Sequence, residues 1–228
     1  MNYSDVQKMA KDTIAFAKKN IHSGMHLIEV RTLCENKLME FGADSFWYWD
    51  IGAFVFAGDE TALSVSGTKY STSDRIIAEN DIITIDLSPQ YQDIWGDYAR
   101  TLLVQNGHIV EAKEIVNAEW KNGILTERLL HEKMRSAVTP QTTFEELYFY
   151  MNALIEDLGY VNLDFLGNLG HSIVRKKEDR IYIEKGNQTC LGEVSYFTFE
   201  PHISLPHSKY GYKRENIYYF ENGALKEL

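Results

Sequence analysis

The fold is decided by residues 82–101, which read Ile82-Ile-Thr-Ile-Asp86-Leu-Ser-Pro-Gln-Tyr-Gln-Asp-Ile-Trp-Gly-Asp97-Tyr-Ala-Arg-Thr101. Two runs of β-branched, apolar and aromatic residues flank a polar segment that contains proline, a pattern typical of a β-hairpin. A chain reversal at Tyr91 and Gln92 places Asp86 directly opposite Asp97 on the neighbouring strand. The stretch therefore predicts a hairpin with one acid in each strand.

These two acids would destabilise the hairpin if nothing compensated their charge. Like charges on opposed positions repel, and a carboxylate in an apolar strand loses hydration without gaining a partner. A positive group between Asp86 and Asp97 would remove both costs. The alternative, in which both acids lie on a solvated outer face of the sheet, stays open at this point.

Length and composition limit the class of protein. The chain has 228 residues, 44% of them hydrophobic, which is enough for one large domain over 1–228. A net charge of -10 argues against nucleic acid or an anionic membrane as a partner. The first residues lack a signal-peptide core, and no apolar run reaches the length of a membrane span, so we expect a cytoplasmic protein. The two cysteines, Cys34 and Cys190, have neither disulfide-framework nor zinc-thiolate spacing.

Apolar residues at helical spacing predict four helices, in two pairs. The first helix has Ser4 as its N-cap and ends near Asn20. The others follow 30–41, 112–134 and 144–158, and Gly42 and Gly159 end the second and the fourth. Aligning these two glycines pairs apolar positions along both helices: Val30 with Leu147, Leu33 with Tyr150, Cys34 with Met151, Leu38 with Ile155 and Phe41 with Leu158.

Strand patterns follow each helix pair, at 53–56 and 82–104 and again at 161–165, 194–199 and 215–220. The chain therefore predicts an α+β fold with two pseudo-repeats, about 1–105 and 106–228. In this fold a curved, mainly antiparallel sheet is covered by two helix pairs.

The second half also carries acids beside apolar strands. Glu200 follows the run Tyr-Phe-Thr-Phe, Glu215 begins another run, and the two could pair across their own hairpin. A glycine-rich turn delivers His171 between the helices and these strands. Carboxylate ligands with one imidazole favour Mn²⁺, Fe²⁺ or Co²⁺ over a structural zinc site. Because four anions around one dication leave excess negative charge, we expect two ions.

Five segments resemble the metal-ligand motifs of the M24 metallopeptidase superfamily, which includes methionine aminopeptidase, aminopeptidase P and creatinase. In sequence order they are Asp81-Ile-Ile-Thr-Ile-Asp86-Leu, Gly96-Asp97-Tyr-Ala-Arg100-Thr, Leu169-Gly-His171-Ser-Ile, Thr198-Phe-Glu200-Pro and Arg214-Glu215-Asn. The resemblance covers nearly the whole chain and implies the duplicated "pita-bread" fold.

The resemblance also implies a dinuclear site. In it, Asp97 and Glu215 bridge two ions, Asp86 completes one, and His171 and Glu200 complete the other. The ions are expected to be Mn²⁺, Co²⁺ or Fe²⁺, with Zn²⁺ as a further candidate. A metal-bound hydroxide would attack the scissile carbonyl, and Glu200 would relay the proton.

Two positions depart from the pattern of active peptidases in this superfamily. The segment Ser64-Val-Ser-Gly-Thr-Lys69 lacks the usual upstream substrate-binding histidine. A second histidine is expected seven places after His171, where this chain has Glu178. We therefore name Glu178, Glu200 and His202 as candidate catalytic residues, with His207 as an alternative to His202.

The leading hypothesis is an aminopeptidase-like metallohydrolase of peptide or amide bonds, with Xaa-Pro peptides as a first substrate to test. One alternative is a metal-dependent enzyme acting on a non-peptide small molecule. A second is a catalytically silent pita-bread binding protein. The superfamily also implies a homodimer. Aromatic residues at 47–49 would line a substrate pocket or belong to the core or a subunit interface. Arg100 would anchor a substrate carboxylate or neutralise the surroundings of Asp97, and the charged run 175–180 would be a solvated turn or a lid.

Overall fold

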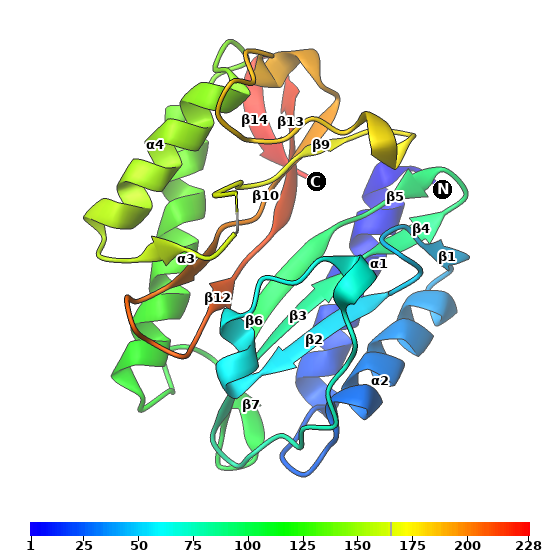
Figure 1. The fold of residues 1–228 in the computed structure, drawn as a ribbon. Coiled ribbons are helices and arrows are strands. Elements are labelled where there is room, and N and C mark those ends of the chain that lie inside the picture. Colours follow the sequence, from blue (N-terminus) through cyan, green and yellow to red (C-terminus); the bar gives the residue numbers. More distant parts are fainter. Residues whose placement is uncertain (165) are drawn as a thin grey trace.

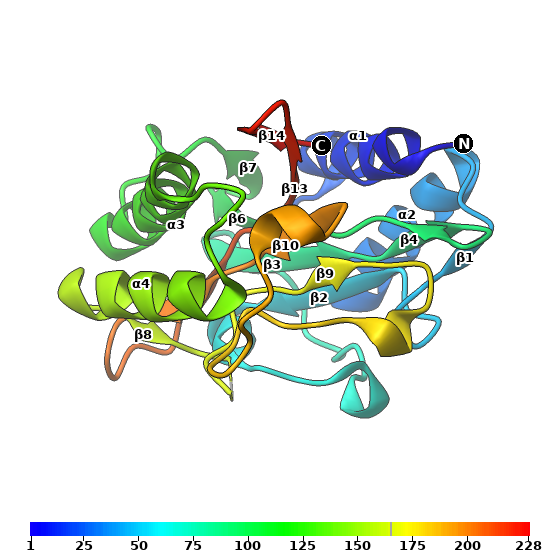
Figure 2. The same cartoon turned by 90° about the horizontal axis from the view of Figure 1, so that it is seen from above.

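The computed structural model describes residues 1–164 and 166–228, in which two pairs of helices lie at opposite ends of the molecule with strands between them (Figures 1 and 2). The helices are α1 (Tyr3–Asn20), α2 (Leu27–Glu40), α3 (Ala118–Ala137) and α4 (Phe144–Asp157), with 3-10 turns η1 (Gly58–Ala62), η2 (Gly67–Lys69), η3 (Lys177–Asp179) and η4 (Leu191–Glu193). The strands of the first half are β1 (Ser45–Phe46), β2 (Ala53–Ala57), β3 (Asp81–Leu87), β4 (Pro89–Tyr91), β5 (Ile94–Trp95), β6 (Tyr98–Gln105) and β7 (His108–Val110). Those of the second half are β8 (Val161–Asn162), β9 (Ser172–Ile173), β10 (Tyr196–Phe199), β11 (His202–Ser204), β12 (Tyr212–Lys213), β13 (Asn216–Glu221) and β14 (Ala224–Glu227).

The four predicted helices are present, with corrections at two of their starts. The N-cap of α1 is Asn2, not Ser4, because the Asn2 side chain accepts a hydrogen bond from the Asp5 amide and Asp5 bonds back in a capping box. Helix α3 begins six residues later than predicted, since Asn117 caps it and accepts from the Trp120 amide. Of the apolar residues between 112 and Asn117, Ala112 and Ile115 are buried in the core without being helical, whereas Val116 is 84% exposed.

Paired helix positions behave alike in α2 and α4. Val30, Cys34 and Leu38 are fully buried, as are their predicted counterparts in α4, and both helices end before a glycine with positive φ. Tyr150 and Phe41 are exceptions, with 42% and 38% of their surfaces exposed. The division of the chain into two pseudo-repeats stays a prediction.

The strands pair antiparallel, in the orders β2-β3-β6-β7, β14-β13-β10-β9, β1-β4-β5 and β12-β11-β8. One core lies between α1, α2 and the first of these sheets, and another between α3, α4 and strands of the second half. The α+β class predicted from the sequence is therefore confirmed. Among the described residues, no helix combines the length and apolar character that crossing a membrane requires.

The register of the central hairpin differs from the prediction. The turn lies at Gln92 and Asp93, between the paired residues Tyr91 and Ile94, and Gln92 adopts a positive φ of 57°. Asp86 therefore pairs with Ala99 and not with Asp97. The slip is two residues, so both acids keep the face predicted for them, because side chains alternate with a period of two. Continuing the register past Leu87 and Tyr98 sets Asp97 opposite Ser88.

The second hairpin follows the prediction more closely. Phe199 of β10 pairs with Asn216 of β13, so Glu200 and Glu215 occupy the next opposed positions, just outside both strands. The strand predicted at 161–165 is shorter, because β8 ends at Asn162 and Phe165 lies outside the described residues.

Backbone hydrogen bonds join the two halves beside these hairpins. The Glu215 amide donates to the Ala99 carbonyl at 3.0 Å, and the Thr101 hydroxyl exchanges bonds with the backbone of Lys213 at 3.0 and 2.8 Å. The ends of strands from both halves consequently meet at one place.

Candidate metal centre

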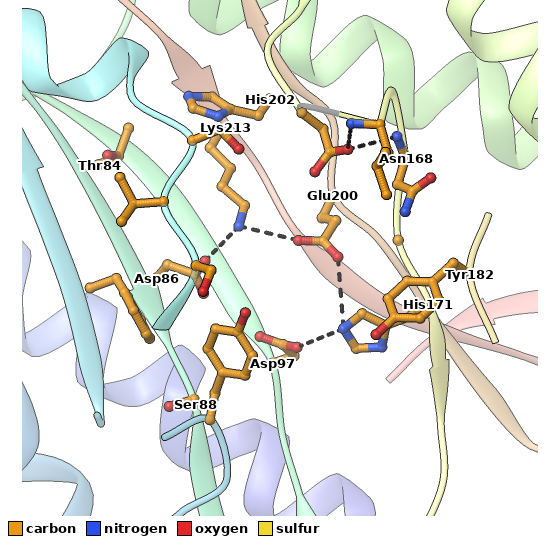
Figure 3. Close-up of a pocket in the computed structure, with 18 of the residues that line it drawn as sticks. Thr84, Asp86, Ser88, Asp97, Asn168, His171, Tyr182, Glu200, His202 and Lys213 are labelled. Carbon is orange, nitrogen blue, oxygen red and sulfur yellow. Dashed lines mark hydrogen bonds and ion pairs between the residues drawn. The ribbon is translucent and has the colours of Figure 1, made fainter. Parts of the chain in front are cut away.

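The five predicted ligands lie at strand ends on both sides of this junction. Asp86 is near the end of β3 and Asp97 directly precedes β6. His171, Glu200 and Glu215 stand next to β9, β10 and β13. Four of the five line one cavity of about 520 Å³: Asp86, Asp97, His171 and Glu200. Figure 3 shows these four side chains pointing toward one another from separate strands.

Asp97, His171 and Glu215 form a compact group with ligand atoms within 4.8 Å of one another. His171 Nε2 lies 3.5 Å from Asp97 Oδ2 and 3.7 Å from Glu200 Oε1. Its Nδ1 is 3.1 Å from the Ser172 carbonyl oxygen, an acceptor that requires the proton on Nδ1. In neutral His171 the lone pair of Nε2 therefore faces carboxylate oxygens, the arrangement of a histidine oriented to ligate a cation.

Glu215 supplies the strongest sign that a cation belongs here. Its side chain is fully buried, and neither carboxylate oxygen has a hydrogen-bond partner among the described residues. Burying an unpaired carboxylate is costly, so native proteins pair such groups or use them to coordinate metals. The chemistry and spacing of these three residues fit one divalent cation.

Lys213, which the sequence analysis did not identify, lies on the other side of the cluster. Its Nζ is 2.5 Å from Asp86 Oδ2 and 3.1 Å from Glu200 Oε2, as the dashed lines in Figure 3 show. A signal for it exists in the sequence. Lys213 stands two residues before Glu215, and alternate residues of an extended segment share a face.

The pKa values of the acids differ between the side of the cluster that holds Glu215 and the side that contacts Lys213. Burial raises the pKa of Asp97 to about 6, and the Asp86 charge adds to the effect. Burial, followed by the Asp97 and Glu200 charges, raises the pKa of Glu215 well above its usual value. Burial would also raise the pKa of Glu200, but Lys213 and His171 outweigh it and lower that pKa. Burial opposes ionisation of Lys213, yet Asp86 and Glu200 raise its pKa well above the ordinary value.

Arg100 acts behind the site and does not line the cavity. Its Nη1 donates to the Ala99 and Glu215 carbonyl oxygens, each at 2.7 Å, and its Nη2 donates to Asn216 Oδ1 at 2.6 Å. The guanidinium is therefore neither a substrate anchor nor a partner of the Asp97 carboxylate, the two roles considered from the sequence. Instead it holds the backbone that carries Glu215.

Aromatic side chains and one arginine form the outer wall of the cavity. The Arg180 guanidinium lies over the rings of Trp47, Tyr48 and Tyr182, at 4.8, 5.9 and 5.7 Å from their centroids. All four residues line the cavity, whereas Trp49 is 53% exposed and does not. The charged run at 175–180 is solvated as far as Asp179, but Arg180 turns toward the cavity.

Of the other candidate catalytic residues, His202 lines the cavity, and Glu178 and His207 do not. Glu178 is exposed in η3 and does not line the cavity, because the 3-10 turn directs its side chain to solvent. His202 does line it, with Nε2 at 2.7 Å from the Thr61 carbonyl oxygen. Burial, with Lys213 adding to it, lowers the pKa of His202 to about 4, so this ring is neutral. His207 is exposed and outside the cavity lining.

Comparisons with known proteins bear on the family and the fold of the chain. The model of metallopeptidase family M24 matches residues 2–222. The chain is 30% identical over 158 residues to the Xaa-Pro dipeptidase of Pyrococcus furiosus, which is 68% of this chain and 41% of that protein. It is 28% identical over 136 residues to the Xaa-Pro dipeptidase of Pyrococcus horikoshii, 59% of this chain and 35% of that one. The chain thus spans less than half the length of these curated relatives.

Solved structures share the fold. An X-Pro aminopeptidase from Thermotoga maritima superposes with a TM-score of 0.80 at 19% identity, over 98% of this chain and 58% of that one. A methionine aminopeptidase from Rickettsia prowazekii superposes with a TM-score of 0.72 at 16% identity, over 100% of this chain and 97% of that chain. These likenesses confirm the pita-bread fold that the motifs imply.

Proposed function

Because the chain belongs to metallopeptidase family M24, we propose that it is a metal-dependent hydrolase that cleaves a peptide bond next to a free amino terminus. The observation that carries the proposal is the buried group of Asp97, His171 and Glu215 beside a cavity, in which the Glu215 carboxylate has no hydrogen-bond partner among the described residues. The dipeptidase names of the relatives make Xaa-Pro peptides the first substrates to test.

Asp97, His171 and Glu215 would hold a divalent cation, and Asp86 and Glu200 would complete a dinuclear set. Mn²⁺, Co²⁺ or Fe²⁺ suits carboxylates with one imidazole, and Zn²⁺ is the further candidate. When bound, such an ion lowers the pKa of a water molecule and polarises a carbonyl group.

Glu200 is the residue we assign to proton transfer. Lys213 lowers its pKa, so the carboxylate is ionised and able to accept a proton. One oxygen is 3.7 Å from His171 Nε2 and 3.4 Å from the Thr198 hydroxyl, and the other is on Lys213. These contacts fix the orientation of the carboxylate toward the cavity.

The cavity wall fits a short peptide with two free ends. Asp164 and Glu184 bring further acids to the wall, which suit a cationic amino group. Arg180 makes no salt bridge within the part of the chain that the structure describes, so its charge is available to an anionic group such as a carboxylate. The partly exposed ring of Tyr48 offers an apolar surface for a prolyl ring.

Peptide cleavage tests the proposal directly. The protein, loaded with Mn²⁺, is expected to hydrolyse Xaa-Pro dipeptides, and a chelator is expected to stop the reaction. Asp97→Asn is the inactive control, and Lys209→Met, a change at an exposed residue outside the cavity, should leave turnover unchanged. Turnover that survives both the chelator and Asp97→Asn would remove the proposal.

A second candidate function is metal-dependent chemistry on a non-peptide small molecule. It is favoured by the wall at 63–66, where Leu63, Ser64, Val65 and Ser66 offer hydroxyls and apolar groups but no imidazole. Profiling the purified protein against a peptide library and a metabolite extract separates the two, because only the first function gives sequence-dependent peptide cleavage. Tight association without any product would instead support a silent binding protein. The cytoplasmic location and the homodimer stay predictions.

A further inference from the structure

Two pairs of acids meet at this site: Asp86 and Glu200 line the cavity, as does Asp97, whereas Glu215 is buried next to Asp97. Among the described residues, only the pair of Asp86 and Glu200 has a lysine or arginine side chain in salt-bridge contact. Asp86 and Glu200 share the Lys213 ammonium, at 2.5 and 3.1 Å. On the other side, Glu215 has no partner for either oxygen among the described residues, and Asp97 faces His171 at 3.5 Å. The two halves of the acid cluster are therefore different kinds of site.

We infer that Lys213 is a built-in competitor for a metal ion at Asp86 and Glu200. The chain then binds one divalent cation readily at Asp97, His171 and Glu215. A second cation between Asp86 and Glu200 must displace the Lys213 ammonium from both carboxylates. The inference deepens the proposed function, since it concerns the metal loading of the same site.

Charge and burial explain why the competition is effective. The Lys213 and Glu200 side chains are 20% and 22% exposed, and Asp86 is 22% exposed, so all three are largely withdrawn from water. Opening a buried ion pair leaves a charge without a partner, and the incoming ion must offset that loss. Lys213 is also anchored from both sides of its own backbone, because Thr101 exchanges hydrogen bonds with its amide and carbonyl groups. The ammonium can move only by rotation of its side chain.

In the part of the chain that the structure describes, no lysine or arginine forms a salt bridge with the Glu215 carboxylate. Arg100 contacts the carbonyl oxygen of Glu215 and not its carboxylate. Within the described residues, Asp97, His171 and Glu215 bring their ligand atoms within 4.8 Å of one another, close enough to hold one metal ion. Asp86 and Glu200 do not belong to this group. The first metal ion is therefore expected at Asp97, His171 and Glu215, where the carboxylates lack a lysine or arginine partner. The second is expected at Asp86 and Glu200, which already contact Lys213.

Equilibrium dialysis against Mn²⁺, with metal content measured per chain, tests the inference. The wild-type chain is expected to bind one ion, and a second only at a Mn²⁺ concentration roughly 100-fold higher or more, the size expected when a buried ion pair must be opened. Lys213→Met keeps the apolar stem and removes the charge, so it should bind two ions at similar concentrations. Lys209→Met is the matched control and should behave as wild type.

Electron paramagnetic resonance gives a second readout that does not depend on activity. Wild type with one equivalent of Mn²⁺ is expected to show the spectrum of an isolated ion, and Lys213→Met with two equivalents that of a spin-coupled pair. If Lys213→Met does not fold, Lys213→Gln takes its place and is titrated in the same way. Two ions of equal affinity in wild type, or no gain of a second ion in the lysine variants, would overturn the inference.

These outcomes separate the inference from the proposed function. A chain that binds one ion and gains another on Lys213→Met, but cleaves no peptide, keeps the inference and loses the peptidase. A chain that cleaves Xaa-Pro peptides and binds two ions equally keeps the peptidase and loses the inference.

Discussion

Asp86 and Glu215 are both acids at strand ends beside one cavity, yet their surroundings differ in one decisive respect. Asp86 is half-buried and ion-paired with Lys213, whereas Glu215 is fully buried with no partner for its carboxylate among the described residues. The pKa of Glu215 is accordingly raised well above its usual value, mainly by burial. The comparison teaches that similar motif acids can do different work, and that the unpartnered side is where a cation is needed most.

The largest expected difference between the two sides of the cluster is in Mn²⁺ affinity, when one acid on each side is replaced by its amide. Asp97→Asn should weaken Mn²⁺ binding by at least about 100-fold, because loss of a mere outer-shell partner already costs 10- to 100-fold. Asp86→Asn should weaken binding of the first ion by less than about 10-fold, since that ion does not rely on Asp86 and Glu200 still holds Lys213. Isothermal titration with Mn²⁺ measures both.

The control for these variants is a check that both are still folded. Both changes are nearly isosteric, so circular dichroism and thermal melting should report intact proteins. Equal losses of affinity in Asp86→Asn and Asp97→Asn would show that the two sides load together, contrary to the asymmetry described above.

Arg100→Met should remove the hydrogen bonds that hold the backbone at Glu215. It removes donors to the carbonyl oxygens of Ala99 and Glu215 and to Asn216 in a buried place, so we expect a loss of about 2–5 kcal/mol in the free energy of unfolding. Because the Glu215 backbone loses its anchor, affinity for the first ion should fall about 10- to 100-fold in the folded protein. Urea unfolding measures the former and titration the latter. Lost stability with unchanged Mn²⁺ affinity would make Arg100 a purely structural residue.

The sequence could predict the five ligand candidates because each is an acid or a histidine beside an apolar strand, where it is conspicuous. The hairpin register was off by two residues, since a turn at Gln92 was not distinguishable from one at Tyr91, but the even shift left Asp86 and Asp97 on the predicted face. Lys213 was missed because a lysine near a strand end is ordinary. Its role depends on how 211–216 lies against β6, which is a tertiary contact.

Glu127 adds a third acid to this comparison: it is buried, and among the described residues no cationic side chain forms a salt bridge with it, although Arg214 and Arg100 are near enough to affect its pKa. Burial raises its pKa to about 7 although the Arg214 and Arg100 charges act against the shift. Because the folded pKa lies above the ordinary 4.5, the folded state binds the proton more tightly. The stability that Glu127 contributes is therefore complete below pH 4.5 and is lost as the pH rises to about 7.

Glu127→Gln should remove this dependence. Between pH 4.5 and 7 the wild type is expected to lose up to about 3 kcal/mol of unfolding free energy relative to the variant, from the linkage of a pKa shift to stability. Urea unfolding of both proteins in this pH range measures the difference, and other titrating groups cancel because they are common to both. A difference that does not change with pH would mean that Glu127 is ionised throughout.

Glu178→Gln is expected to have the smallest effect on stability, Mn²⁺ binding and turnover. It tests whether the structure or the sequence motif predicts the role of this position better. The residue occupies the position where the superfamily resemblance expects a histidine, yet its side chain is exposed in η3 and away from the cavity lining. Surface substitutions without a special contact change stability by about 0.5 kcal/mol or less, so unfolding and Mn²⁺ titration should match wild type. Peptide turnover should also be unchanged, whereas Lys213→Met, at a residue that no ligand motif marks, should alter metal loading. If Glu178→Gln instead lowers turnover while Mn²⁺ binding stays intact, the segment 175–180 must approach the substrate during the reaction, and the motif would have been the better guide.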